Sequence, residues 1–73
     1  KDEIKMTKLT DKEWVKLIKR FCKYFEQGLR TGQSYSNALA DVNMKAYNEI
    51  TVTDDDCFYD DNKVIKFIRR LNE

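Results

Sequence analysis

Five aspartates gather near the end of the chain, and carboxylates in such numbers could bind a divalent cation. They are Asp54, Asp55, Asp56, Asp60 and Asp61. A calcium loop of the EF-hand type needs oxygen ligands at alternating positions, Gly at the sixth position and Glu at the twelfth. Counted from Asp54, the sixth residue is Tyr59 and the twelfth is Ile65. The pattern therefore favours turn and helix-capping roles, and we expect no metal and no cofactor.

The side chain that most often carries acid–base catalysis is missing. The 73 residues include no His, which removes the commonest general base and metal ligand. The sequence also has no nucleophile elbow, no P-loop and no dinucleotide-binding fingerprint. We therefore expect no catalytic residues and a protein that is not an enzyme.

The two cysteines, Cys22 and Cys57, are far apart and form neither a CxxC pair nor a zinc site. A disulfide between them is geometrically possible, but without a secretion signal a reducing compartment is favoured. Cys22 falls among the apolar positions of a predicted helix, and Cys57 lies beside Phe58 and three aspartates. We expect both thiols to be buried and unreactive.

Basic side chains form two groups that could contact phosphate or an acidic partner. One is a lysine row and the other lies near the end of the chain: Lys12, Lys16, Lys19 and Lys23, then Lys66, Arg69 and Arg70. The total charge of +1 conceals this segregation, since residues 31–62 hold a single Lys against seven acidic residues. The competing interpretation is that both groups are simply the solvated faces of amphipathic helices.

Two further sets of surface residues suggest binding. Gln33, Ser34 and Asn37 carry the amide and hydroxyl groups that read base edges, as in the second helix of a helix-turn-helix. The acidic segment that follows would repel a phosphate backbone, which argues against this interpretation. Phe58 and Tyr59 are adjacent aromatics, of which at least one is expected at the surface as a possible anchor for a partner.

Helices must position all of these groups, and the first is the clearest. Thr10 and Glu13 form a capping box, and Gly28 supplies a left-handed C-terminal cap. Between them the spacing predicts a helix over 11–27 with one continuous apolar face. That face comprises Trp14, Leu17, Ile18, Phe21, Cys22 and Phe25.

The remaining apolar periodicity predicts three more helices, over 32–42, 44–51 and 61–71. Thr31 and Asn43 are expected to cap the first two of these, and Asp60 and Asp61 to begin the last. The last helix turns Val64, Phe67, Ile68 and Leu71 inward. The fold class is therefore all-α, with three to four helices around an aromatic-rich core in one domain spanning 1–73, after a frayed lead-in over 1–8.

Part of the sequence resembles short uncharacterised proteins of marine T4-like tailed phages. The resemblance rests on Arg30-Thr31-Gly32-Gln33, Asn37-Ala38-Leu39, Tyr47, Ile50, Thr53 and Asp56-Cys57-Phe58-Tyr59-Asp60-Asp61. It covers most of residues 13–71 and implies a phage or environmental origin and a setting in the host cytoplasm. It brings no catalytic residue, because the family has no assigned activity.

Two functional hypotheses follow. The first is a non-catalytic module that binds a host or phage protein, as a monomer or homodimer and without membrane contact. The alternative is a helical nucleic-acid-binding domain.

Overall fold

Four α-helices and one short 3-10 turn make up the chain in the computed structural model, which describes residues 8–53 and 55–72. In order they are α1 (Asp11–Glu26), α2 (Thr31–Val42), α3 (Met44–Thr51), the 3-10 turn η1 (Asp61–Lys63) and α4 (Val64–Asn72). No strand occurs in the described ranges. The predicted all-α class is therefore confirmed. The lead-in expected over residues 1–8 lies, apart from Lys8, outside the described residues.

Most helix boundaries follow from local caps. The Thr10–Glu13 capping box is present, with the Glu13 amide donating to Thr10 Oγ1 at 3.2 Å and the Thr10 amide donating to Glu13 Oε1 at 2.9 Å. Asn43 Oδ1 accepts the Ala46 amide at the start of α3. Gly28, with φ of +97°, lets the chain turn after α1. These predicted caps are confirmed.

The start of α2 differs from the prediction. Arg30, rather than Thr31, holds the N-cap position and offers the helix no side-chain hydrogen bond. The Gly32 amide in the first turn instead donates to Asp61 Oδ1 at 2.8 Å, a residue 29 positions further along the chain. A cap supplied through tertiary structure leaves no local signal in the sequence.

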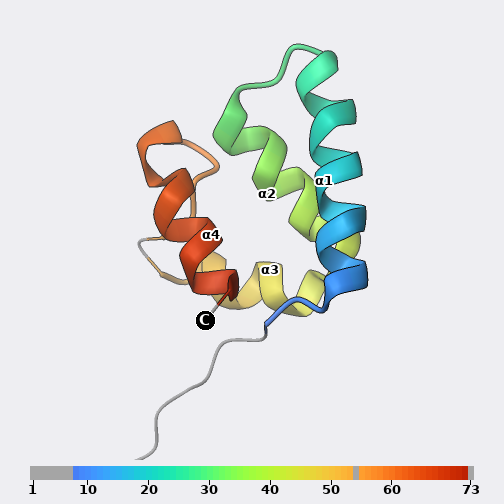
Figure 1. Cartoon of the computed structure of the whole chain (residues 1–73). Helices are drawn as coiled ribbons and strands as arrows, with labels where there is room; N and C mark the ends of the chain where they lie inside the picture. Colours follow the sequence, from blue (N-terminus) through green and yellow to red (C-terminus); the bar gives the residue numbers. More distant parts are fainter. Residues whose placement is uncertain (1–7, 54, 73) are drawn as a thin grey trace, which may run out of the picture.

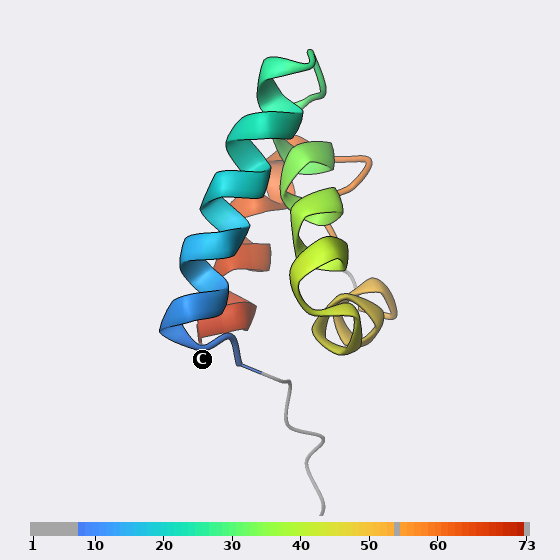
Figure 2. The ribbon, with the colours of Figure 1, turned by 90° about the vertical axis from the view of Figure 1, so that its right-hand side faces the viewer.

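The central element is α2 (Figure 1), with α1 antiparallel on one side, α4 on the other and α3 crossing at one end. Figure 2 shows α1 and α2 side by side. Every residue of α2 is buried or half-buried except Asp41. Small residues permit this close packing, since Gly32, Ser34, Ser36 and Ala38 are all buried.

The core is aliphatic at its centre and linked by aromatic rings. Among its fully buried side chains are Leu17, Leu39, Ile50, Phe67 and Leu71. Phe21 of α1 stacks on Tyr35 of α2 with ring centroids 4.2 Å apart, and Tyr35 lies 6.3 Å from Phe67 of α4. These rings connect three helices, as the expected aromatic-rich core requires. None of the helices in the described ranges combines the length and the hydropathy needed to cross a bilayer.

The predicted apolar face of α1 is only partly buried. Leu17 is fully buried and Trp14 and Phe21 pack against the core, but Ile18 and Phe25 are 46% and 51% exposed. Cys22 is exposed as well, so the expectation that it is buried is wrong. The reason is geometric, because the elements packed against α1 cover an arc narrower than the apolar stripe.

Candidate functional site

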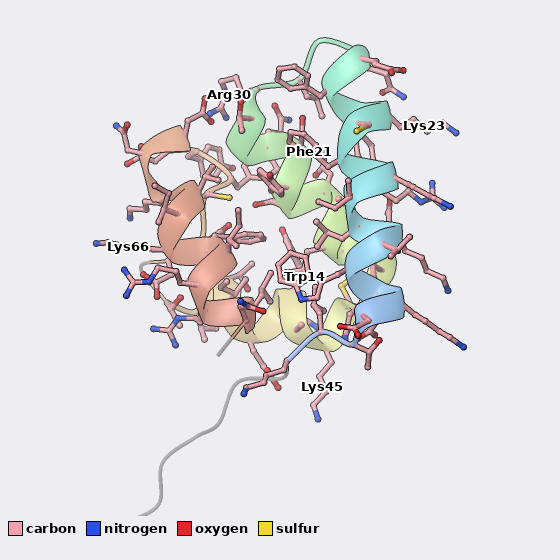
Figure 3. All side chains as sticks on the ribbon, viewed as in Figure 1. Trp14, Phe21, Lys23, Arg30, Lys45 and Lys66 are labelled. Atoms are coloured by element: carbon pink, nitrogen blue, oxygen red, sulfur yellow. The ribbon has the colours of Figure 1, made fainter. Side chains whose placement is uncertain are left out.

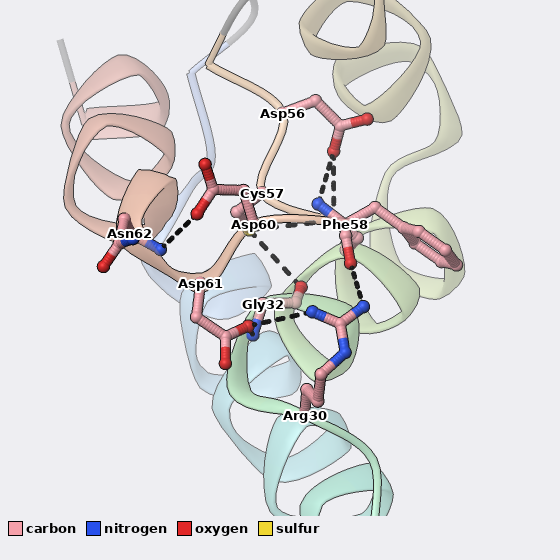
Figure 4. Close-up of polar contacts among 9 residues, drawn as sticks. Arg30, Gly32, Asp56, Cys57, Phe58, Asp60, Asp61 and Asn62 are labelled. Carbon is pink, nitrogen blue, oxygen red and sulfur yellow. Dashed lines mark hydrogen bonds and ion pairs between the residues drawn. The ribbon is translucent and has the colours of Figure 1, made fainter.

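The acidic segment forms a polar clasp with the start of α2 (Figure 4), which we call the α2–loop clasp: Arg30, Gly32, Ser36, Asp56, Cys57, Phe58 and Asp61. Arg30 Nη2 donates to the Phe58 carbonyl at 2.7 Å, and Arg30 Nη1 lies 3.3 Å from Asp61 Oδ1. The same carboxylate accepts the Gly32 amide. One aspartate therefore holds both the backbone and a side chain of the entry to α2.

A glycine is required at position 32, where the first turn of α2 meets the loop of the α2–loop clasp. A Cβ at this position would lie 2.1 Å from the Cys57 carbonyl oxygen and 2.8 Å from Asp61 Oδ1. The Cys57 thiol donates to the Gly32 carbonyl at 3.3 Å. Burial raises the pKa of Cys57 to about 11, so the thiol stays protonated and unreactive near neutral pH. Cys57 is thus buried, as predicted.

The other described aspartates of this segment also have structural contacts. Asp56 Oδ1 accepts from Ser36 Oγ at 3.2 Å and from the Phe58 amide at 3.1 Å. Asp55 Oδ2 pairs with Arg70 Nε at 2.5 Å, and Asp60 Oδ1 caps η1 through the Asn62 amide. The predicted turn and capping roles are confirmed for Asp56 and Asp60, whereas the Asp55 carboxylate forms an ion pair instead. Within the described ranges, no group of three or more acidic or Cys residues is arranged to hold a metal ion.

The three residues assigned to base reading do not form an exposed surface. Ser34 is fully buried, and its Oγ has no hydrogen-bond partner among the described residues. Gln33 and Asn37 are half-buried on a helix that is covered on most sides. The assignment of Ser34 to a base-reading face is therefore wrong, because α2 is the central helix of the fold.

The two basic groups do not form one surface. Lys23 of α1 and Lys66 of α4 lie on opposite sides of the molecule (Figure 3). Lys66 and Arg69 are exposed, whereas Arg70 is half-buried and paired with Asp55. Among the described residues, the group on α4 is thereby reduced to two cations without an ion pair, so the larger basic surface belongs to α1.

The lysine row is exposed throughout its length: Lys12, Lys16, Lys19 and Lys23. None of the four makes an ion pair within the described part of the chain. An open hollow of about 520 Å³ lies between this row and α2, lined by Lys16, Lys19, Arg20, Lys23, Asp41 and Val42. On its α2 side, Asp41 accepts a hydrogen bond from the Tyr24 hydroxyl at 2.5 Å, which raises the pKa of Tyr24.

Beside the lysine row, α1 exposes an apolar strip that we call the α1 ridge: Val15, Ile18, Cys22 and Phe25. Val15 is 55% exposed, and the Phe25 ring stacks on Phe21 with centroids 5.5 Å apart. Sequence reasoning recognised most of these positions as apolar but assigned them to the core. Their alternating spacing of three and four residues, separate from that of the buried positions, was the signal that could have distinguished them.

The aromatic pair lies outside this surface. Tyr59 is 85% exposed and Phe58 is half-buried, and their rings meet edge to face at 4.6 Å. One of the two rings is therefore at the surface, as expected, but the acidic segment around it is occupied by the α2–loop clasp. Its role as a partner anchor stays a prediction.

No protein-family description, no curated protein and no solved structure matches the chain.

Proposed function

We propose that this protein is a non-catalytic protein-binding module and that α1 carries its docking surface. The observation that supports this proposal is the combination of the α1 ridge and the lysine row on one helix. Large apolar side chains that stay half-exposed beside unpaired cations are typical of a surface that a partner covers. Elsewhere in the described chain, the polar groups of the α2–loop clasp are paired.

Nucleic-acid binding is the second candidate, and the lysine row is the observation in its favour. Four exposed ammonium groups on one helix, unpaired among the residues that the structure describes, can neutralise phosphates. The apolar ridge has no use in such contacts, and α2 does not present a base-reading face. Any binding of this kind would therefore be independent of sequence and steeply dependent on salt.

The resemblance to phage proteins stays a prediction. With it we propose a phage or environmental origin and action in the host cytoplasm, on a host or phage protein.

Selection from an unbiased peptide library tests the proposed function. The selected peptides should bind the wild-type protein and lose most of their affinity on Ile18→Ser or Phe25→Ser. The matched control is Ile65→Ser, which alters a 69% exposed residue on α4 and should leave binding unchanged. The proposal fails if no selected peptide depends on α1, or if generic duplex DNA binds through Lys16 and Lys19 with no contribution from Ile18.

A further inference from the structure

Two apolar seams run along α1, offset by one residue. The first packs against the core, with Leu17 fully buried and the other three members partly buried: Trp14, Leu17, Phe21 and Tyr24. The second is the α1 ridge, in which each member follows a member of the first by one position. An offset of one residue rotates a helical seam by about 100°. The two seams therefore face different neighbours, and only the first has its neighbour within the described chain.

Both seams have the three-four-three spacing of a and d positions in a coiled coil. In the α1 ridge, Val15 and Cys22 take the a positions and Ile18 and Phe25 the d positions. This spacing suits the knobs-into-holes packing of one further helix. Resting on the proposed function, we propose that the α1 ridge binds a single amphipathic helix of a partner protein, with carboxylates along the flank that meets the lysine row.

The charge of the partner follows from the residues beside the ridge. In this register Lys12 and Lys19 occupy e positions, and Lys16 and Lys23 lie just outside them at b positions. Residues at e and g contact the flanks of a neighbouring helix and set partner choice through ion pairs. The four lysines are exposed and unpaired within the described chain, so their charges are available to glutamates or aspartates of the partner.

The opposite flank of the ridge is apolar. Its g positions are Trp14 and Phe21, both half-buried, and Phe25 stacks on Phe21. A partner helix would therefore meet aromatic rings along one edge and ammonium groups along the other. This asymmetry predicts acidic side chains on one flank of the partner and apolar side chains on the other.

A second copy of the chain fits this surface poorly. An antiparallel pair of α1 helices would bring e positions against e positions, so lysine would face lysine. A parallel pair would place the lysines against the aromatic g positions and leave them unpaired. A lipid surface also fits poorly, because membrane-surface helices present a broad apolar face with the basic residues opposite. The α1 ridge is a single seam with basic residues on one side.

Two synthetic helical peptides test the proposal. Both carry Leu at every a and d position and Ala at every g position, and one has Glu at every e position where the other has Lys. Affinity for the full chain is measured by fluorescence anisotropy at low salt and at about 0.15 M salt. The acidic peptide should bind at least about tenfold more tightly than the basic one, and Lys19→Glu should reduce or reverse this preference.

A second measurement needs no substitution. The exposed thiol of Cys22 lies at an a position, while Cys57 is buried with its pKa raised to about 11. Alkylation near neutral pH therefore reports on Cys22 alone. The acidic peptide should slow this alkylation about tenfold or more, and prior alkylation should block peptide binding. Ile65→Ser should alter neither result.

Four outcomes overturn the proposal: equal affinity for the two peptides, failure of both to bind, self-association of the free chain through Ile18 and Phe25, and Ile18-dependent binding to anionic phospholipid vesicles. If the designed peptides fail while library peptides still depend on Ile18, the helical acidic partner is wrong and the proposed function stands. If no ligand of any kind depends on Ile18 or Phe25, both are wrong.

Discussion

The α2–loop clasp and the outer face of α1 both carry many charged groups but use them in opposite ways. In the clasp, Asp61 accepts from Gly32 and Arg30, and Asp56 accepts from Ser36 and Phe58. On α1 the lysine row makes no ion pair with any described residue, and apolar side chains stand half-exposed beside it. Density of charge is therefore a poor guide to function here. Whether the charges are already paired within the chain separates the structural region from the candidate binding surface.

The largest expected effect is on the clasp. Gly32→Ala should lower the free energy of unfolding by about 3 kcal/mol, because the new Cβ would lie 2.1 Å from a backbone oxygen that cannot move freely. Urea denaturation measures the change. Gly28→Ala is the matched control: its Cβ meets nothing within 4 Å, so only the positive φ resists it, at about 1 kcal/mol. Equal losses of unfolding free energy for Gly32→Ala and Gly28→Ala would contradict the close approach of the Cys57 carbonyl oxygen to Gly32.

The buried thiol of the clasp should make stability depend on alkaline pH. The folded state raises the pKa of Cys57 to about 11, so it holds a proton that the unfolded chain releases at lower pH. The stabilisation from the protonated thiol is complete below the pKa that Cys57 has in the unfolded chain. It is lost as pH rises toward 11, by at most about 1.4 kcal/mol per pH unit. Tyr24, Tyr35 and Tyr47 also have raised pKa values and add to the loss. Urea denaturation across this pH range should show a shallower decline for Cys57→Ala than for the wild-type chain, and parallel declines would contradict the assignment.

Two neighbouring serines offer a smaller comparison. Ser36→Ala should cost about 1 kcal/mol, because Ser36 Oγ donates to Asp56 and contacts the Cys57 thiol. Ser34→Ala removes a buried hydroxyl that has no partner among the described residues, so it should be neutral or slightly stabilising. Thermal unfolding of both variants checks the prediction. A larger loss of stability for Ser34→Ala than for Ser36→Ala would contradict the prediction.

The smallest expected effect is on the outer face of α1. Ile18→Ser should change the free energy of unfolding by at most about 0.5 kcal/mol, because the side chain is already 46% exposed. Leu17→Ser, one residue earlier and fully buried, should destabilise the fold by about 3 kcal/mol. Denaturation curves for the pair therefore measure how sharply α1 divides between structure and surface. A large loss of unfolding free energy for Ile18→Ser would show that the α1 ridge is part of the core.

The elements that sequence predicted well are those with local causes. The capping box at Thr10, the cap at Asn43 and the turn at Gly28 each involve residues within one helical turn. The start of α2 was placed at the wrong residue because its first-turn amide is satisfied by Asp61, 29 positions away. Ser34 was assigned to an exposed face because its polarity says nothing about the number of elements that cover α2.

The candidate site shows the same division. The lysine row was found from its spacing, since charged residues four apart share a face on any helix. The sequence did not distinguish the α1 ridge from the core. Apolar residues have the same helical spacing whether their face packs against the same chain or against another one.

By itself, the sequence determined the four-helix pattern, the local caps at Thr10, Gly28 and Asn43, and the separation of basic from acidic segments, since these depend on residues within a few positions of one another. The tertiary structure alone decided which apolar seam of α1 is covered, which aspartates are paired and which helix lies at the centre. Those properties depend on contacts between segments distant in the chain, and such contacts leave no periodic signal in either segment.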